Sequence, residues 1–228
     1  KNGFPMLIPH PIVEAISAGL MMTIIAAIVS GVISLCLAIV LDLIQWQSQS
    51  VITKSIKTGC QLLRTVPEMV LLLIFYFGIL LSLKRLCGHF VHCPPLVAGI
   101  ITLSLIYTAY LQPVLTGAKQ SIAISQQQAA SLSGLSSWQQ YRWIILPQSI
   151  QHGLPAGLNL AVCLIKDTAL LSIIGCNELL NRIQLLATST AKPFLFYALA
   201  CLLYLTLTIP LEILIRNKEH HSKVSEYV

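Results

Sequence analysis

Five long stretches of mostly apolar residues constrain the fold of this chain more than any other feature. A helix needs about 20 such residues to cross the hydrocarbon core of a bilayer. The stretches are continuously apolar instead of alternating every second residue, which favours helices over the strands of a membrane barrel. The sequence therefore predicts an all-α membrane protein with five transmembrane helices. They are expected at residues 15–44, 62–83, 96–111, 154–174 and 193–215.

The overall composition agrees with a membrane protein. The chain has 228 residues, of which 56% are hydrophobic and 10% charged, and a soluble domain of this size cannot bury so much apolar surface. Small residues in the first stretch, such as Gly19 and Gly31, predict close packing against another helix. We expect a single membrane domain over residues 12–216, with a polar loop at about 117–150, and a short tail at 217–228.

The distribution of Lys and Arg predicts the orientation, because cytoplasmic loops carry an excess of both. If the N-terminus lies outside, eight of these residues fall inside and five outside, so this topology is favoured and the 117–150 loop lies in the cytoplasm. The net charge of +6 then reflects orientation and anionic lipid headgroups, and no nucleic-acid binding is expected. The inside set is Lys54, Lys57, Arg64, Lys119, Arg142, Arg216, Lys218 and Lys223.

The seven cysteines fall into two groups. Five lie in or beside apolar stretches, where we expect small buried hydrophobes. Cys87 and Cys93 instead lie in the outside loop between the second and third stretches, where they could form a short disulfide or remain free thiols. With His89 and His92 they could also bind zinc, but ligands this crowded rarely reach tetrahedral geometry, so no metal site is expected. The first group comprises Cys36, Cys60, Cys163, Cys176 and Cys201.

A polar segment at residues 125–147 separates two apolar stretches. Residues 126–132 and 137–145 can each form a short helix, with Gly134 between them for a sharp reversal. Pro147 is expected at the start of the helix that re-enters the membrane, where its missing N–H costs little. Two short helices joined in this way form a compact projection, which could sit in a groove of a partner and pass a rigid-body movement to the membrane helices.

The polar segment, and the chain as a whole, each have an alternative interpretation. An interfacial amphipathic helix with Trp138, Tyr141 and Trp143 as headgroup anchors fits the periodicity equally well. A membrane enzyme is disfavoured, because the sequence contains no His-Glu-x-x-His zinc motif, no Gly-x-Ser-x-Gly elbow and no phosphate-binding loop. Any ATP hydrolysis that drives the protein is therefore expected on another polypeptide.

Charged residues inside apolar stretches are functional candidates, since each costs about 2.5–3.5 kcal/mol near a helix centre and must face protein or water. Arg64 and Glu68 are four residues apart, so on one helix they could pair with each other. Asn159 is predicted on roughly the same side of its helix as the Lys166–Asp167 pair. The charged set is Arg64, Glu68, Lys166, Asp167 and Glu178.

Several short motifs occur in order along most of the chain, and with them it resembles the permeases of the polar amino acid uptake family of ATP-binding-cassette importers. It is similar to the arginine branch in particular, through Glu68 after Pro67 and through residues 187–194. The shared motifs are Arg64-Thr-Val-Pro67, Tyr76-Phe77-Gly78, Ala109-Tyr110, Leu146-Pro147-Gln148, Leu154-Pro155, Asn159 and Lys166-Asp167-Thr168.

The resemblance has departures at the loop. Pro113 and Thr116 stand where the family usually has Glu and Arg, and Gln128 stands where it has the Glu of Glu-Ala-Ala. Because the Ala-Ala and Gly spacing remains, coupling to an ATPase is expected to be retained without the salt bridge that those residues make in relatives. The coupling residues that the resemblance implies are Gln128, Ala129, Ala130, Gly134, Leu146 and Pro147.

The resemblance also implies a substrate pathway. Asn159 and Asp167 are carried over from the family pattern. Glu68 is added because the forked donors of a guanidinium need a carboxylate as acceptor. Arg64 or backbone N–H groups could hold the substrate carboxylate. The implied function is a permease subunit of an importer for a polar amino acid, with arginine as the first candidate. A secondary amino acid carrier or a channel not driven by ATP is the alternative.

The implied fold is that of type I importer permeases (MetI-like), in the bacterial inner membrane with the N-terminus periplasmic and the C-terminus cytoplasmic. Expected partners are two ATP-binding subunits that carry ATP and Mg, a periplasmic amino acid binding protein and membrane lipid. A second permease subunit is also expected, and a heterodimer is favoured over a homodimer. The chain itself is expected to bind no cofactor and to catalyse no reaction.

Overall fold

The computed structural model describes residues 10–47, 51–87 and 94–226. Every regular element in these ranges is a helix, which confirms the predicted all-α class. The elements are α1 (His10–Gln47), α2 (Val51–Thr65), α3 (Glu68–Cys87), α4 (Pro95–Gln120), α5 (Ile124–Leu132), α6 (Ser137–Gln140), the π-helix η1 (Tyr141–Ile145), α7 (Leu146–Asp167), the 3₁₀-helix η2 (Thr168–Ile174), α8 (Leu179–Thr190) and α9 (Pro193–Glu226).

Four helical segments of the described chain are long and apolar enough to cross a membrane, and a bent pair of helices adds a fifth. The number of spans equals the predicted five if the bent pair crosses as one span, and each predicted stretch falls on one of these segments. The last helix is longer than expected, since α9 continues to Glu226 through most of the predicted tail. The four segments are Pro11–Gln47, Pro95–Gln120, Ser137–Ile174 and Pro193–Asn217, and the bent pair is Val51–Thr65 with Glu68–Gly78.

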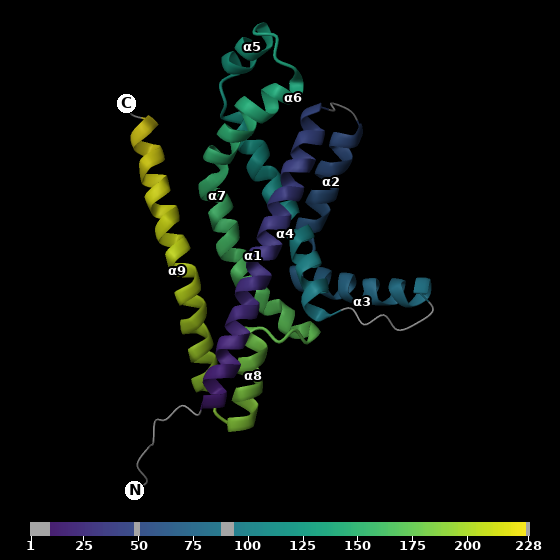
Figure 1. The fold of residues 1–228 in the computed structure, drawn as a ribbon, viewed down its shortest axis with the longest axis vertical. Helices are drawn as coiled ribbons and strands as arrows, with labels where there is room; N and C mark the ends of the chain where they lie inside the picture. The colour runs from purple at the N-terminus through teal and green to yellow at the C-terminus, as the bar shows by residue number, and fades with distance from the viewer. Residues whose placement is uncertain (1–9, 48–50, 88–93, 227–228) are drawn as a thin grey trace.

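The prediction of one continuous helix at 62–83 is wrong, because α2 and α3 meet at an angle of 107°. Pro67 lacks an N–H and disfavours the helical conformation at Val66, so α2 ends at Thr65. A new helix starts at once, since the Pro67 carbonyl accepts hydrogen bonds from Val70 N at 3.0 Å and Leu71 N at 3.1 Å. In Figure 1, α3 consequently points away from the other helices.

The remaining long helices run roughly alongside one another (Figure 1). α1 packs along α4, and α4 packs in turn against α7. α5 and α6 lie at one end of the bundle together with the C-terminus, whereas α8 and the N-terminal end of α1 lie at the other. The start of α1 and the end of α9 therefore lie at opposite ends of the described structure.

Small residues allow the close packing that was predicted for the first stretch. A Cβ added to Gly19 would lie 3.0 Å from the Leu179 Cα, so α1 and α8 touch through backbone at this point. A Cβ on Gly31 would lie 3.4 Å from a methyl group of Leu164. On α4, a Cβ on Gly99 would overlap the Leu171 side chain at 2.5 Å. These glycines fix how closely α1 and α4 approach the α7 to α8 segment.

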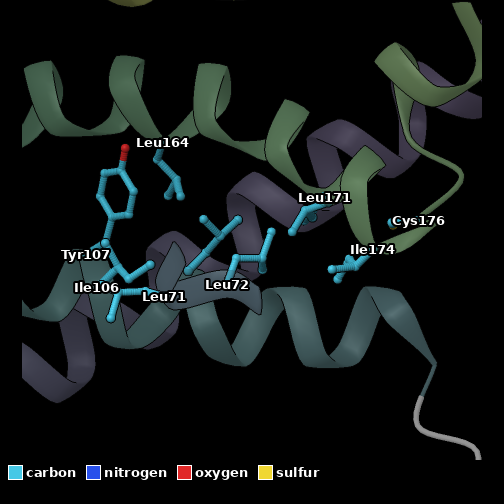
Figure 2. Packing of buried hydrophobic residues seen from close by; sticks show 10 residues of the cluster. Leu71, Leu72, Ile106, Tyr107, Leu164, Leu171, Ile174 and Cys176 are labelled. Carbon is cyan, nitrogen blue, oxygen red and sulfur yellow. The ribbon is translucent and has the colours of Figure 1, made fainter. Parts of the chain in front are cut away.

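The largest buried cluster joins α3, α4, α7 and η2 (Figure 2). Because α3 begins with Glu68, Leu71 and Leu72 enter this cluster and place the start of α3 beside the middle of α4. Figure 2 shows the Tyr107 side chain on α4 with its hydroxyl directed toward α7. The packing therefore brings the start of α3 and the end of α7 to the same stretch of α4.

Candidate functional site

The centre of the candidate site is a pair of tyrosines on α4 that each donate a hydrogen bond to a carboxylate. The Tyr107 hydroxyl donates to Asp167 Oδ2 at 2.7 Å, and the Tyr110 hydroxyl donates to Glu68 Oε1. The two rings are 5.7 Å apart between centroids. α4 therefore connects the first residue of α3 to the last residue of α7, and two of the predicted pathway residues are brought together.

The other two predicted pathway residues are placed differently. Arg64 lies exposed on α2, and its Nε is 3.4 Å from the Cys60 carbonyl of the same helix. The bend puts Arg64 and Glu68 on separate helices, and no ion pair joins them among the described residues. Asn159 is exposed on α7, as is Lys166, and no hydrogen bond between described residues joins either one to Asp167.

The electrostatics of these two carboxylates are unusual for a membrane helix bundle. Glu68 and Asp167 are each partly buried, and their hydrogen-bond donors are neutral hydroxyls. No ion pair within the described ranges involves either one. A carboxylate has more acceptor capacity than one hydroxyl uses, so both can still accept hydrogen bonds from a cation. Chemically, the arrangement suits a ligand with two separate cationic groups.

An apolar cavity of about 270 Å³ adjoins this site between α1, α4 and α7. The Tyr107 ring forms part of its wall, so this one side chain contacts both the cavity and Asp167. Apart from Tyr107 and Ser34, the wall is made of glycine and aliphatic residues, among them Leu35, Leu111 and Leu154. Such a wall can accommodate methylene groups but offers little to charged ends.

Sequence reasoning missed the role of the two tyrosines. Tyr110 was noted only as part of a motif, and Tyr107 was not noted at all. Their three-residue spacing on an apolar helix was an available signal, because a tyrosine hydroxyl inside a membrane bundle needs a hydrogen-bond partner. The sequence does not say which partner each hydroxyl finds.

The polar segment forms the predicted helix, reversal and second helix. α5 ends at Leu132, Gly134 takes a left-handed φ of 74°, and α6 begins after a capping box formed by Ser136 and Gln139. Gln128 and Ala129 are exposed on α5, whereas Ala130 is buried. These two short helices project beyond the membrane helices in Figure 1.

Pro147 is in the first turn of α7, as predicted, but the helical conformation does not begin there. The preceding π-helix η1 is continuous with α6, and the Leu146 N–H donates to the Tyr141 carbonyl five residues earlier. The returning helix thus begins at the Ser136 cap. Gln148 Nε2 donates to Gln126 Oε1 at 2.8 Å, which ties the start of α7 back to α5.

Comparison with known proteins identifies the family. Residues 46–220, more than half of the chain, match the family model described as "Binding-protein-dependent transport system inner membrane component". The chain belongs to this family.

Curated relatives agree with this assignment of the permease. The arginine ABC transporter permease protein ArtQ of Haemophilus influenzae is 32% identical over 199 residues, which cover 87% of this chain and 89% of the relative. The histidine/lysine/arginine/ornithine transport system permease protein HisQ of Salmonella typhimurium is 33% identical over 166 residues, covering 71% of this chain and 73% of the relative. The permease is therefore an amino acid ABC transporter subunit and a multi-pass membrane protein.

Solved structures confirm the predicted importer-permease fold. An amino acid ABC transporter solved with histidines superposes with a TM-score of 0.79 at 22% identity, covering 96% of the permease and all of that chain. The MetNI methionine ABC transporter, in an inward-facing conformation, gives a TM-score of 0.69 at 14% identity, with coverage of 92% and 99%. At these identities the likeness concerns the fold alone.

Glu178 of the permease, one of the charged residues singled out in the sequence, caps the start of α8. Its side chain is fully buried and accepts hydrogen bonds from Leu180 N and Asn181 N, both at 2.7 Å. The hydroxyls of Thr23 on α1 and Tyr204 on α9 also donate to it. Burial raises the pKa of the Glu178 carboxyl, and these four hydrogen bonds act in the opposite direction. Glu178 therefore holds the start of α8 to α1 and α9.

The cysteine predictions for the permease have mixed outcomes. Cys60 and Cys176 are buried, as expected, but Cys36, Cys163 and Cys201 are exposed on helix surfaces. All five are free thiols. Cys87 is the last residue of α3, but Cys93 and the nearby histidines lie outside the described residues, so the possible Cys87–Cys93 disulfide stays a prediction. Within the described ranges, no cluster of His, Cys, Asp or Glu could hold a metal ion.

Proposed function

We propose that this permease imports a cationic amino acid, with arginine as the first candidate. The observation that carries the proposal is the pair of partly buried carboxylates, Glu68 and Asp167, which are held by neutral tyrosine hydroxyls beside an apolar cavity. Arginine has a guanidinium and an α-amino group at the two ends of a short methylene chain. The relatives named for arginine, for histidine, lysine, arginine and ornithine, and for octopine support the same class of substrate.

The roles of the individual residues follow from charge and position. Asp167 and Glu68 accept hydrogen bonds from the two cationic groups, while Tyr107 and Tyr110 fix the orientation of the carboxylates. Arg64 and Asn159 are exposed on this chain and supply polar groups for the substrate carboxylate from the open side of the site. Lys166 is exposed beside Asp167 and takes no part in the proposed binding.

The proposed machinery around the permease is that of an ATP-driven importer. Two ATP-binding subunits, which carry ATP and Mg, contact the loop at about 117–150 through Gln128, Ala129, Ala130 and Gly134, with Leu146 and Pro147 at its exit. A periplasmic binding protein delivers the amino acid, and a second, non-identical permease subunit completes the pathway. The domain at 12–216 has its N-terminus in the periplasm and its C-terminus in the cytoplasm.

Reconstitution with and without partners tests this proposal. The permease, its ATPase, a second permease subunit and a binding protein are placed in vesicles, and uptake of labelled arginine and glutamine is measured with and without ATP. We expect ATP-dependent uptake of arginine in preference to glutamine. Uptake by the permease alone, driven by an ion gradient, would instead support a secondary carrier.

A second experiment tests the loop separately. Ala129→Glu and Gly134→Glu place a charged side chain on the exposed tip, and at Gly134 the left-handed backbone also disfavours any Cβ. We expect both variants to lose ATP-driven uptake. Ser55→Glu is the matched control, because Ser55 is exposed in the first turns of α2, outside the loop. Normal uptake by both loop variants would show that the loop does not couple.

A further inference from the structure

A buried carboxylate at the cytoplasmic-loop end of α1 contacts both sides of the loop. Asp42 is only 1% exposed, and its Oδ1 lies 2.6 Å from Lys119 Nζ. Its Oδ2 accepts a hydrogen bond from the Tyr141 hydroxyl at 3.0 Å. Lys119 is in the last turn of α4, where the chain enters the loop, and Tyr141 begins η1, where the chain leaves it. Both stems of the loop therefore end on one carboxyl group.

The surroundings of this junction are rigid. Tyr141 is 1% exposed and packs with Ile122 and Ile145 against Trp46 of α1. Trp46 Nε1 donates to the Ser137 carbonyl at 3.2 Å, which adds a contact between α1 and the start of α6. Close packing of this kind transmits a displacement instead of absorbing it.

No other charged side chain of α4 competes with Lys119 for Asp42. Pro113 and Thr116, which lie within two turns before Lys119 on α4, are uncharged. This part of α4 consequently has Lys119 as its one charged side chain. A buried carboxylate is costly unless it is paired and hydrogen-bonded, so Asp42 holds both stems in a fixed relation to α1.

We propose that Asp42 is the positioning residue through which movement of the 121–140 loop is passed to α1, with Lys119 and Tyr141 as its two contacts. The inference rests on the proposed coupling of the loop to an ATPase. When the ATPase subunits move the loop, the two stems pull on one carboxylate, and α1 moves with them as a rigid rod. α1 in turn packs along α4, which carries the tyrosines of the candidate site.

The test measures transport per ATP in the full reconstituted complex. Three variants are compared with wild type: Tyr141→Phe, Lys119→Met and Lys119→Arg. We expect each variant to bind the ATPase and to keep basal ATP turnover. Tyr141→Phe and Lys119→Met should lower arginine transported per ATP by about 5-fold or more, the lower end of typical coupling between sites. Lys119→Arg keeps the charge and should restore the wild-type ratio.

Thr23→Val is the matched control, because Thr23 is an equally buried polar residue of α1 that bonds to α8 at the other end of the helix. It should lower thermal stability without changing transport per ATP. Wild-type ratios in both Tyr141→Phe and Lys119→Met would overturn the inference, and so would an equal fall in Thr23→Val. If Lys119→Met does not fold, the result for Tyr141→Phe alone decides the inference, because this variant removes only the hydroxyl that contacts Asp42. Failure of wild-type protein to bind any ATPase would instead overturn the proposed function.

Discussion

The Glu68–Asp167 pair and the single residue Asp42 contact different parts of α4 and have opposite kinds of partner. Near the middle of α4, Glu68 and Asp167 are partly buried and receive hydrogen bonds from tyrosine hydroxyls. At its end, Asp42 is fully buried and lies against a lysine ammonium group. A neutral donor orients a carboxylate but leaves its charge, whereas an ammonium group cancels it. Glu68 and Asp167 therefore keep a negative charge that the proposed cationic substrate can meet, whereas the charge of Asp42 is matched within the chain.

The largest expected effect tests whether the Asp42 pair is structural. Lys119→Met leaves a buried carboxylate without its cation, which costs about 3–5 kcal/mol. We expect a clear fall in the thermal unfolding temperature in detergent. Lys54→Met, at an exposed lysine of α2, serves as the control and should unfold like wild type. The double variant Asp42→Asn/Lys119→Met should regain part of the loss, and a single variant as stable as wild type would break the comparison.

The next effect concerns Asp167, a carboxylate without an ion-pair partner among the described residues. Asp167→Asn keeps an acceptor for the Tyr107 hydroxyl but removes the charge, so stability should change little. A hydrogen bond to a charged group contributes about 1.5–3 kcal/mol, so arginine uptake at low concentration should fall by about 10- to 100-fold. Glutamine uptake measured in the same vesicles is the control and should change by less than about 3-fold. Equal losses for both ligands would mean that Asp167 is structural.

A smaller effect is expected when the orientation of Asp167 is disturbed. Tyr107→Phe removes the hydroxyl that orients the Asp167 carboxylate but leaves its charge, so the KM for arginine should rise by only about 2- to 10-fold. Tyr197→Phe, at an exposed tyrosine on α9, provides a matched control. A KM unchanged by Tyr107→Phe would show that the hydroxyl is not needed to orient the carboxylate.

The smallest effect concerns the loop itself, which has no charged residue between Lys119 and Arg142. Its exposed apolar side chains include Ile124 and Leu132, at 71% and 89% exposure. Since salt screens only charges, the affinity for an ATPase subunit should change by less than about 3-fold between low and high salt. Gln128→Glu introduces a carboxylate on the exposed face of α5 and should make binding salt-dependent. A steep salt dependence in wild type would contradict this view of the loop.

The bilayer requirement made most of the fold predictable, because apolar stretches of sufficient length have few alternatives in a membrane. Proline was the ambiguous signal. Pro67 ends a helix, but Pro113, Pro155 and Pro210 lie inside α4, α7 and α9 without ending them. Whether neighbouring groups satisfy the backbone that a proline frees depends on tertiary packing, which sequence does not reveal.

Of the candidate site, the sequence predicted the carboxylates but not their tyrosine partners, because the partners also depend on tertiary packing. Charge inside an apolar stretch pointed to Glu68 and Asp167, and the same criterion applied to residues 15–44 would have found Asp42. It also selected Glu178, which is buried as a helix cap. The tyrosine partners could not be assigned, because the Tyr107 to Asp167 contact joins residues 60 positions apart.

The π-helix Tyr141–Ile145 determines which side of α7 is turned toward α1 and α4. Successive residues of an α-helix are rotated by about 100°, and a π-turn inserts one extra residue into that progression. The insertion shifts the angular phase between Tyr141, which must meet Asp42, and the part of α7 that lines the cavity and ends at Asp167. Deleting one residue from this turn would keep the helix but rotate Tyr141 relative to α7. The contact of Tyr141 with Asp42 and the present position of Asp167 beside the cavity could then not both be kept.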